Sequence, residues 1–459
     1  MVKIITTTAL VLLSFFGYSQ DIDGSWSGEL EVQGMKLPLV FNIKKEGTQF
    51  KTTLDSPKQG AKDIPVKTTT FENNILAIDA SDLGISYTGN YTNGKIEGKF
   101  KQGGMELPLV LEQNKAQKDY TFNRPQTPKE PFDYNMEEVT ILNPIDKNTL
   151  AGTITTPKDK KNFPILVMIT GSGGQNRDEE LFNHKPFAVI ADDFAKKGIA
   201  TLRLDDRGVG KSSKVDKKST TADFATDINT AVDFLVAKGY TNIGLIGHSE
   251  GGMIAPMVAT MNKNVKFIIS MAGPGIKIQD LMYKQIEQGG LLAGEKPEKV
   301  KLDVATTKKL YAFIESYKGA ELAKDLETFY INELKKYPTG FIKPESLEVE
   351  AKAEIKQITH PWFLYFLKFD PALYISKLKI PVLAINGSKD FQVDAISNLE
   401  GFKKELTKAG NKHFEIVNFE GLNHLFQECT TGAFSEYVEI EQTIAPKVLE
   451  KMSDWVLKL

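Results

Sequence analysis

A serine between two glycines carries the clearest chemical signal in the chain. The run Gly247-His248-Ser249-Glu250-Gly251 follows the apolar residues 243–246 and precedes a stretch with helical character. A sharp turn from a strand into a helix strains the serine backbone and exposes its hydroxyl group, and flanking glycines keep Cβ atoms out of the turn. We therefore expect Ser249 to be a nucleophile that attacks an acyl carbon.

A serine hydroxyl needs a base to remove its proton, and the base needs an acid to orient it. On a strand–turn–helix arrangement of this kind, the acid and the histidine follow the serine in the sequence. Asp390 comes just after the apolar residues 382–385, and His424 lies in a predicted loop beyond the last strand. We predict that Asp390 is the acid, with Asp394 in reserve, and that His424 is the base.

The other histidines have less suitable positions. His248 precedes the candidate nucleophile, so its side chain should point the other way along the strand and pack there. His184, His360 and His413 are expected to be structural or surface residues.

Negative charge on a substrate carbonyl oxygen requires hydrogen-bond donors beside the nucleophile. One donor is expected from the N–H of the residue after the serine, here Glu250, and the other from the loop after an early strand. That loop is predicted at residues 170–174, after the apolar residues 165–169, and its glycines let the backbone approach a substrate. We expect the second donor to be the N–H of Ser172.

The composition excludes several classes of protein. The chain has 459 residues, of which 41% are hydrophobic and 25% charged, and its net charge of −2 gives no basic excess for nucleic acid. The one cysteine, Cys429, excludes an intramolecular disulfide framework and is interpreted as a bystander thiol. Residues 208–212 look like the end of a phosphate-binding loop, but Asp205 stands where that motif needs glycine, so nucleotide binding is not expected.

The N-terminus is typical of a secretory signal peptide. Lys3 precedes the apolar residues 9–16, and the small residues Gly17 and Ser19 follow. The apolar run is too short for a membrane-spanning helix, which needs about 20 residues. We expect residues 1–19 to be removed after Ser19, which would give a periplasmic or secreted protein without stable membrane insertion.

Residues 20–113 alternate between polar and apolar side chains and contain turn signals such as Asn93-Gly94, which predicts a small antiparallel β domain. The sequence of residues 34–40 recurs, with one substitution, at residues 104–110. We interpret the two segments as similar strands that face each other across one meander. Residues 114–134 include Pro125, Pro128 and Pro131 among polar residues and are expected to form a linker.

Strand-like apolar runs and amphipathic helices alternate over residues 135–459. Several of the runs are continuously apolar, as in a sheet that is buried on both faces. The pattern predicts an α/β fold with a mainly parallel, doubly wound sheet. Residues 276–379 interrupt the alternation and are too long for a loop, so we expect them to form an inserted helical cap.

Several short motifs resemble the α/β-hydrolase superfamily and, more narrowly, the bacterial carboxylesterases grouped near the serine aminopeptidases. The resemblance covers roughly residues 135–459 and is carried by Thr170-Gly171-Ser172-Gly173, Asn176-Arg177-Asp178-Glu179, Asp206-Arg207-Gly208-Val209-Gly210-Lys211-Ser212, Gly247-His248-Ser249-Glu250-Gly251-Gly252, Gly387-Ser388-Lys389-Asp390 and Asn423-His424. It implies that Ser249, Asp390 and His424 form a catalytic triad. Family members often have His-Gly in the oxyanion loop, where this chain has Thr170-Gly171.

The predicted function is that of a serine carboxylesterase acting on a small-molecule ester without metal or organic cofactor. The most aromatic stretch of the chain, residues 360–366, lies in the expected cap, and Trp362 and Phe363 are candidates for the acyl pocket, although packing of the cap on the sheet would use the same residues. An exported serine peptidase of the aminopeptidase type would use the same triad and need an acidic anchor such as Glu250. A third reading is a binding protein that acts through its β domain beside an inactive hydrolase.

Overall fold

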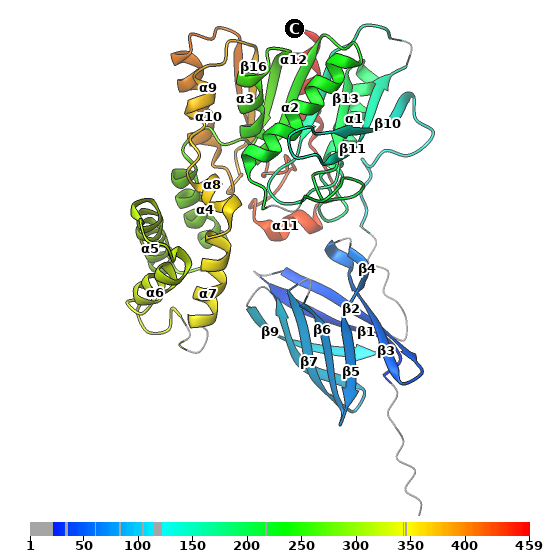
Figure 1. Ribbon diagram of the computed structural model, residues 1–459, viewed down its shortest axis with the longest axis vertical. Coiled ribbons are helices and arrows are strands. Elements are labelled where there is room, and N and C mark those ends of the chain that lie inside the picture. The colour runs from blue at the N-terminus through cyan, green and yellow to red at the C-terminus, as the bar shows by residue number, and fades with distance from the viewer. Residues whose placement is uncertain are drawn as a thin grey trace, which may run out of the picture.

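The chain forms an N-terminal β domain and a larger α/β domain (Figure 1). The computed structural model describes residues 22–459 except 33–34, 60, 82–83, 103–104, 114–121, 159, 216–217, 343 and 345–346. The expected signal peptide, residues 1–19, lies outside the described residues, as do residues 114–121 of the expected linker.

The N-terminal domain is a nine-stranded antiparallel sheet, as the alternating pattern predicts. Its strands are β1 (Gly24–Val32), β2 (Met35–Glu46), β3 (Gln49–Ser56), β4 (Ala61–Pro65), β5 (Thr68–Glu72), β6 (Ile75–Ala80), β7 (Ile85–Thr92), β8 (Lys95–Gln102) and β9 (Met105–Gln113), with a short 3-10 turn, η1 (Pro57–Gln59), after β3. They lie in the order β4-β3-β2-β1-β9-β8-β7-β6-β5. The Thr69 hydroxyl donates to that of Thr52 at 2.9 Å, so the sheet curls until β5 approaches β3.

The described residues of the two similar segments, 35–40 and 105–110, belong to β2 and β9, and these strands flank β1 on opposite sides. They therefore do not face each other directly, because β1 lies between them and pairs with both. Large apolar side chains such as Trp26, Phe41 and Phe100 fill the concave side of the sheet and are almost fully buried. The buried indole of Trp26 donates to the carbonyl oxygen of Ile22 at 2.9 Å, so this large ring leaves no polar group unpaired.

The α/β domain is built on an eight-stranded sheet. Its strands are β10 (Tyr134–Leu142), β11 (Thr149–Pro157), β12 (Ile165–Ile169), β13 (Ala200–Leu204), β14 (Ile243–His248), β15 (Val265–Met271), β16 (Val382–Gly387) and β17 (Phe414–Phe419), in the order β10-β11-β13-β12-β14-β15-β16-β17. β10, β11 and β13 pair antiparallel, and the six strands from β13 to β17 pair parallel. The expectation of a mainly parallel sheet is confirmed.

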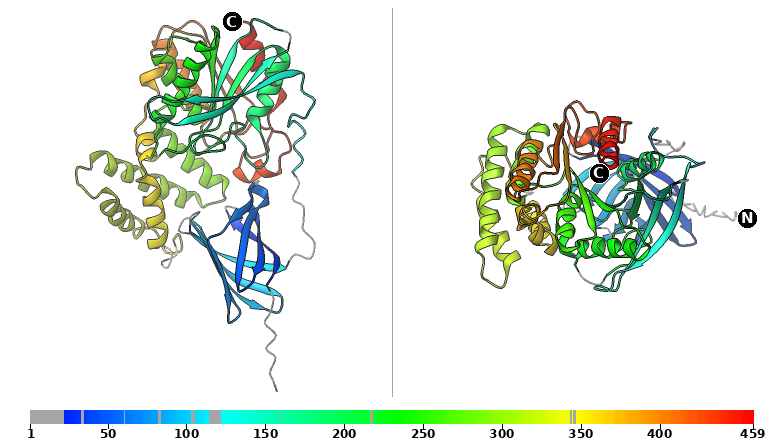
Figure 2. Two further views of the ribbon diagram at one scale, coloured as in Figure 1. Left: turned by 45° about the vertical axis from the view of Figure 1, so that its right-hand side comes forward. Right: turned by 90° about the horizontal axis from the view of Figure 1, so that it is seen from above.

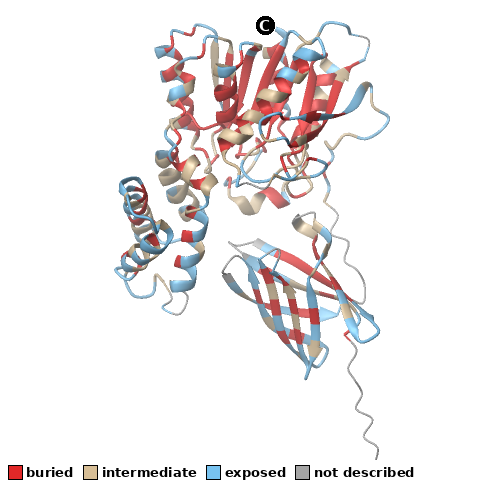
Figure 3. Cartoon of the chain, in the orientation of Figure 1, coloured by how far each residue is buried: buried red, intermediate tan, exposed pale blue. Residues whose placement is uncertain are grey.

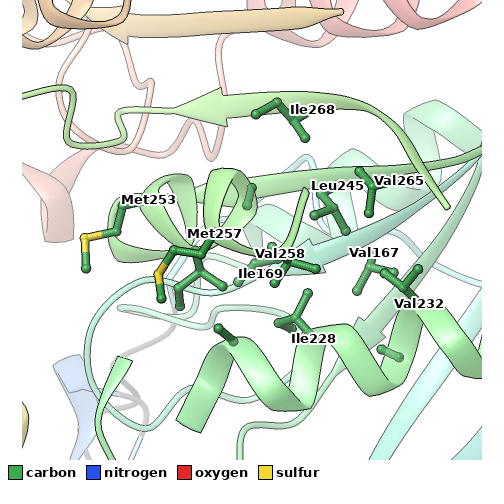
Figure 4. Packing of buried hydrophobic residues seen from close by; sticks show 14 of the residues in the cluster. Val167, Ile169, Ile228, Val232, Leu245, Met253, Met257, Val258, Val265 and Ile268 are labelled. Atoms are coloured by element: carbon green, nitrogen blue, oxygen red, sulfur yellow. The ribbon is translucent and has the colours of Figure 1, made fainter. Parts of the chain in front are cut away.

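Helices cover both faces of this sheet, which explains the continuously apolar strands. Along β12, Val167 and Ile169 join the core under α2 (Thr221–Ala237), α3 (Glu250–Met261) and α10 (Ala395–Lys408), as Figure 4 shows in part. Leu166 and Met168 point to the opposite face, where α1 (Pro186–Lys197) and α12 (Pro446–Leu457) lie. Figure 3 shows these strands as the most continuously buried part of the chain.

Helices interrupt the sheet between β15 and β16, where a helical cap is expected. They are α4 (Ile278–Leu292), α5 (Pro297–Ser316), α6 (Leu322–Leu334), α7 (Leu347–Ile358), α8 (Pro361–Leu367) and α9 (Ala372–Ile375). α5, α6 and α7 share a small hydrophobic core with α8 and project beyond the sheet (Figure 2). None of the helices among the described residues combines the length and apolar character needed to cross a bilayer.

Candidate active site

Ser249 lies in the turn between β14 and α3, where the sequence predicts a strained nucleophile. Its backbone has φ 52° and ψ −118°, in the positive-φ region that side chains other than glycine avoid. A Cβ at Gly247 would collide with the carbonyl oxygen of Gly251, and a Cβ at Gly251 would collide with that of Ile169. The flanking glycines thus permit a turn tight enough to place Ser249 at the carboxyl end of the strand.

Asp390 and His424 form a buried hydrogen-bonded pair at the same edge of the sheet. The Nδ1 atom of His424 lies 2.7 Å from Oδ2 of Asp390. Oδ1 of Asp390 accepts the backbone N–H groups of Gln392 at 2.9 Å and Val393 at 3.0 Å. Because both carboxylate oxygens accept, the Nδ1 atom of His424 carries the proton, and its Nε2 atom is left with a lone pair.

Asp394, the reserve candidate for the acid, has a different role. Its side chain caps α10 by accepting the backbone N–H of Ser397 at 3.0 Å, and the Nζ atom of Lys284 lies 3.3 Å away. The structure therefore pairs Asp390, and not Asp394, with His424.

Ser249 and His424 line one cavity at the sheet edge. The Oγ atom of Ser249 makes no hydrogen bond to His424 within the part of the chain that the structure describes. Hydrogen bonds between a nucleophile and its base are often long without substrate and tighten in the substrate complex. The arrangement is therefore compatible with proton transfer between the two residues.

The loop after β12 lies beside Ser249. A Cβ built on Gly171 would be 3.3 Å from the Cβ of Ser249. Among the described residues, neither the N–H of Ser172 nor that of Glu250 has an acceptor, whereas the N–H of Gly171 donates to Oε1 of Glu179 at 2.7 Å. Two unoccupied backbone donors near a nucleophile are what an oxyanion needs.

Asp206, at the end of β13, holds this loop at two points. Its Oδ1 atom accepts the hydroxyl of Thr170 and its Oδ2 atom accepts the backbone N–H of Gln175, both at 2.8 Å. Burial raises the pKa of Asp206 to about 7, against the effect of these hydrogen bonds, and the charges of Glu179 and Glu250 add to the rise. Asp206 begins one of the motifs that resemble the α/β hydrolases, but no local pattern predicts its two hydrogen bonds, because they reach over thirty residues along the chain.

The walls of the cavity come from three parts of the chain. The loop after β12 and the sheet edge supply Ser172, Ser249 and His424, and the helical insertion supplies an aromatic wall. The helix α11 (Phe434–Glu439) contributes two more rings. The aromatic lining residues are Trp362, Phe363, Phe366, Phe434 and Tyr437. The two candidate pocket residues, Trp362 and Phe363, thus lie in the lining.

The chain resembles known proteins in its sequence. The family model described as the alpha/beta hydrolase fold matches residues 164–427, which is more than half of the chain. The chain belongs to the α/β hydrolase family. Esterase EstD of Thermotoga maritima is 26% identical over 333 residues, covering 72% of this chain and 69% of that protein. A protein named putative esterase/lipase 2 of Mycoplasma genitalium is 29% identical over 113 residues, covering 25% of this chain and 38% of its own length.

Solved structures of esterases also match this α/β hydrolase. The Pyrococcus furiosus esterase Pf2001 is 16% identical with a TM-score of 0.43, covering 74% of this chain and 98% of that one. Est1E from Butyrivibrio proteoclasticus is 18% identical with a TM-score of 0.38, covering 70% of this chain and 98% of that one.

Glu250 connects the nucleophile turn of this hydrolase to the helical insertion. Its Oε1 atom accepts the hydroxyl of Thr221 at 2.7 Å and the indole N–H of Trp362 at 3.0 Å. Its Oε2 atom is buried and has no hydrogen-bond partner among the described residues. Burial raises the pKa of this carboxyl, which favours its neutral form.

The motif at residues 176–179 holds the outer end of the loop that follows β12. Arg177 makes a two-pronged contact with Asp205, at 3.0 Å to Oδ1 and 2.8 Å to Oδ2, and also reaches Glu138 at 2.8 Å. Asp178 pairs with the guanidinium of Arg203 on β13. Two-pronged arginine–carboxylate pairs set geometry as well as energy, so the motif ties the loop to the sheet.

The described part of the expected linker is bonded to the hydrolase domain. The guanidinium of Arg124 donates to the carbonyl oxygens of Phe182 at 3.0 Å, Val438 at 2.9 Å and Ile440 at 2.7 Å. Gln126 donates to the carbonyl oxygen of Ile444 at 2.8 Å. These bonds hold the end of α11, the helix that contributes two rings to the cavity.

The remaining histidines fall into two groups. His360 and His413 are exposed. His184 is buried between the hydroxyl of Thr443 and the carbonyl oxygen of Tyr437, and burial, with the charge of Arg124, lowers its pKa to about 4. Within the described residues no group of three His, Cys, Asp or Glu side chains is placed to hold a metal ion.

Proposed function

We propose that this α/β hydrolase is a serine carboxylesterase in which Ser249, His424 and Asp390 act as a catalytic triad. The observation that carries the proposal is the buried 2.7 Å bond between Asp390 and His424, formed beside the strained turn that presents Ser249. The esterase names of its relatives support the same activity.

In the proposed reaction, Ser249 Oγ attacks the ester carbonyl carbon while His424 Nε2 removes the hydroxyl proton. Asp390 keeps the imidazole in the tautomer with a free Nε2 lone pair and stabilises the imidazolium that forms. The N–H groups of Ser172 and Glu250 donate to the developing oxyanion. His424 then returns the proton to the leaving alcohol, which departs and leaves Ser249 acylated.

Water completes the cycle through the same groups. His424 takes a proton from a water molecule, which attacks the acyl carbon, and then returns the proton to Ser249 as the carboxylic acid departs. The aromatic rings of Trp362, Phe363 and Phe434 line the cavity and favour an apolar acyl or alcohol group. We infer a neutral small-molecule ester as the substrate.

A peptidase of the aminopeptidase type would need an ionised acid to bind the ammonium group of its substrate. Glu250 is the candidate anchor, but Thr221 and Trp362 already occupy its Oε1 atom, and its Oε2 atom, which has no partner among the described residues, is buried. Burial raises its pKa, and a carboxyl that is more readily neutral attracts an ammonium group weakly. These contacts favour an ester over a peptide substrate.

The test compares p-nitrophenyl acetate with aminoacyl anilides, together with labelling by a fluorophosphonate probe. We expect hydrolysis of the ester, slow or undetectable hydrolysis of the anilides, and labelling that disappears in Ser249→Ala. Loss of the nucleophile should lower kcat by at least about 10⁴-fold.

Ser270→Ala is a matched control, because its buried hydroxyl donates to the carbonyl oxygen of Gly252 and lies outside the cavity lining. It should keep both labelling and turnover. Ester hydrolysis that survives in Ser249→Ala would refute the triad, and a preference for the anilides would refute the esterase assignment.

A further inference from the structure

A second carboxylate–histidine pair lies directly behind the first. The Nδ1 atom of His248 is 3.0 Å from Oε1 of Glu179, and its Nε2 atom is 3.0 Å from the carbonyl oxygen of His424. The same Oε1 atom of Glu179 accepts the N–H of Gly171 at 2.7 Å. Glu179 and His248 are both buried, and the rings of His248 and His424 are 4.7 Å apart.

The hydrogen-bond partners of His248 determine where its protons must be. A carbonyl oxygen only accepts, so the Nε2 atom of His248 carries a proton to donate to the backbone of His424. The contact between Nδ1 and Glu179 needs a second proton. Because Oε1 of Glu179 also accepts the N–H of Gly171, the carboxylate form suits both contacts, and the ring of His248 holds both protons.

The groups around the ring support this state. Burial works against a charge on His248, but the carboxylate of Glu179, the carbonyl oxygen of His424 and the nearby charge of Asp390 outweigh it and raise the pKa of His248. Among the described residues, Glu179 and His424 contact this ring, and Asp390 acts on it through its charge.

Both ends of this pair contact elements of the catalytic machinery. Gly171 immediately precedes Ser172, whose N–H is a proposed oxyanion donor, and His424 is the proposed base. Burying two charges costs free energy. A protein with a well-packed apolar pair in the same place is often as stable as one with the ion pair. Glu179 also has φ 52°, a left-handed conformation that costs about 1 kcal/mol or more for such a residue. A packing role alone does not account for a buried ion pair on a strained backbone.

We propose that Glu179 and His248 form a permanent carboxylate–imidazolium pair that positions the oxyanion loop and the backbone of the catalytic histidine. The inference rests on the proposed esterase function. Both are positioning residues, since they act through Gly171 and His424 and do not touch the reacting atoms. Their effect should appear when charge develops on the substrate oxygen, and so in kcat more than in KM.

Two measurements test the pair. In the full-length protein at pH 8, ¹⁵N NMR should show both ring nitrogens of His248 protonated, whereas an ordinary histidine is neutral there. The chain has only five histidines, so the ring signals are few enough to assign. In Glu179→Gln the His248 ring should lose its charge, and kcat for p-nitrophenyl acetate should fall about 10–100-fold with KM within threefold, less than the loss of a whole oxyanion donor.

Glu180→Gln is the matched control, because the polar partners of this side chain among the described residues are Asn176 at 3.2 Å and Lys185 at 3.7 Å, and it does not line the cavity. It should leave kcat and the His248 spectrum unchanged. A neutral His248 ring in the unaltered protein, or equal kcat values for the two variants, would overturn the proposal. Absence of ester hydrolysis in the unaltered protein would instead refute the esterase function, and the spectrum would still decide the charge of the pair.

Discussion

The edge of the eight-stranded sheet and the helical insertion face the same cavity but are built differently. At the sheet edge, Asp390, Asp206 and Glu179 each accept at least two hydrogen bonds, which fix the nucleophile turn, the oxyanion loop and His424. The insertion faces the cavity with aromatic rings, and its outer helices have a separate small core.

We infer from this difference that the sheet edge carries the chemical step and the insertion binds the substrate. Transfer of a proton and stabilisation of an oxyanion depend on fixed distances between polar atoms. Apolar contacts have no such directional requirement and tolerate changes of shape. Changes at the sheet edge should therefore affect kcat, and changes in the insertion should affect KM and the choice of ester.

The largest effect is expected for Asp390→Asn. The two backbone N–H groups that donate to Oδ1 would hold the amide oxygen there and direct the amide NH₂ group at Nδ1 of His424. Nδ1 would then accept, and the proton would move to Nε2, which could no longer take the proton of Ser249. We expect kcat to fall by about 10⁴-fold with little change in KM, measured with p-nitrophenyl acetate.

Asp394→Asn makes the same chemical change four residues away. Asn caps helices about as well as Asp, so this variant should retain turnover within about threefold. Similar losses in the two variants would mean that the Asp390–His424 bond has no special role.

Asp206→Asn should change how stability depends on pH. In the folded protein its pKa is raised from 3.8 to about 7, so between these values the folded state holds a proton that the unfolded chain has lost. The free energy of unfolding should then decrease as the pH rises from about 4 to 7, by up to about 4 kcal/mol from this residue. The Asn variant should lose this slope in urea titrations.

Asp454 is exposed and offers a control for that experiment. Asp454→Asn should keep the pH dependence of the unaltered protein. If the free energy of unfolding of Asp206→Asn kept the same dependence on pH, Asp206 would be ionised at low pH in the folded protein. Burial would then not raise its pKa.

The smallest effect is expected in the insertion. Trp362→Ala removes an aromatic wall and the N–H that donates to Glu250. We expect KM for an aromatic ester to rise about tenfold, or about 1.4 kcal/mol of binding, with kcat within threefold. Trp362→Phe keeps an aromatic ring, smaller than the indole, and removes the N–H, so its KM should rise less than that of Trp362→Ala. If kcat of Trp362→Ala fell as far as that of Asp390→Asn, the sheet edge and the insertion would not differ in their effects on kcat and KM.

Much of the architecture was predictable because it follows from local patterns. Alternation of polar and apolar residues predicts the N-terminal β domain. The continuous apolar runs predict a sheet covered on both faces. The structure confirms both predictions. Asp390 and His424 could be chosen because each follows a strand. Their catalytic roles with Ser249 remain predictions.

The polar network behind the site could not be predicted in the same way. Glu179 reaches His248 across 69 positions, and Asp206 reaches Thr170 across 36. No periodicity or local motif encodes such a contact. We expected His248 to pack because of its direction along the strand. Its sequence position does not reveal the two acceptors that its ring contacts, the carboxylate of Glu179 and the carbonyl oxygen of His424.

Arg124 belongs by sequence to the segment that precedes the hydrolase domain, yet three carbonyl groups of that domain accept its protons. A truncation that began at β10 would leave those acceptors without their charged donor, and a buried acceptor without a partner costs about 1–3 kcal/mol. The smallest fragment that retains the wall of the cavity formed by α11 therefore extends upstream of Arg124, well before the first strand of its own sheet.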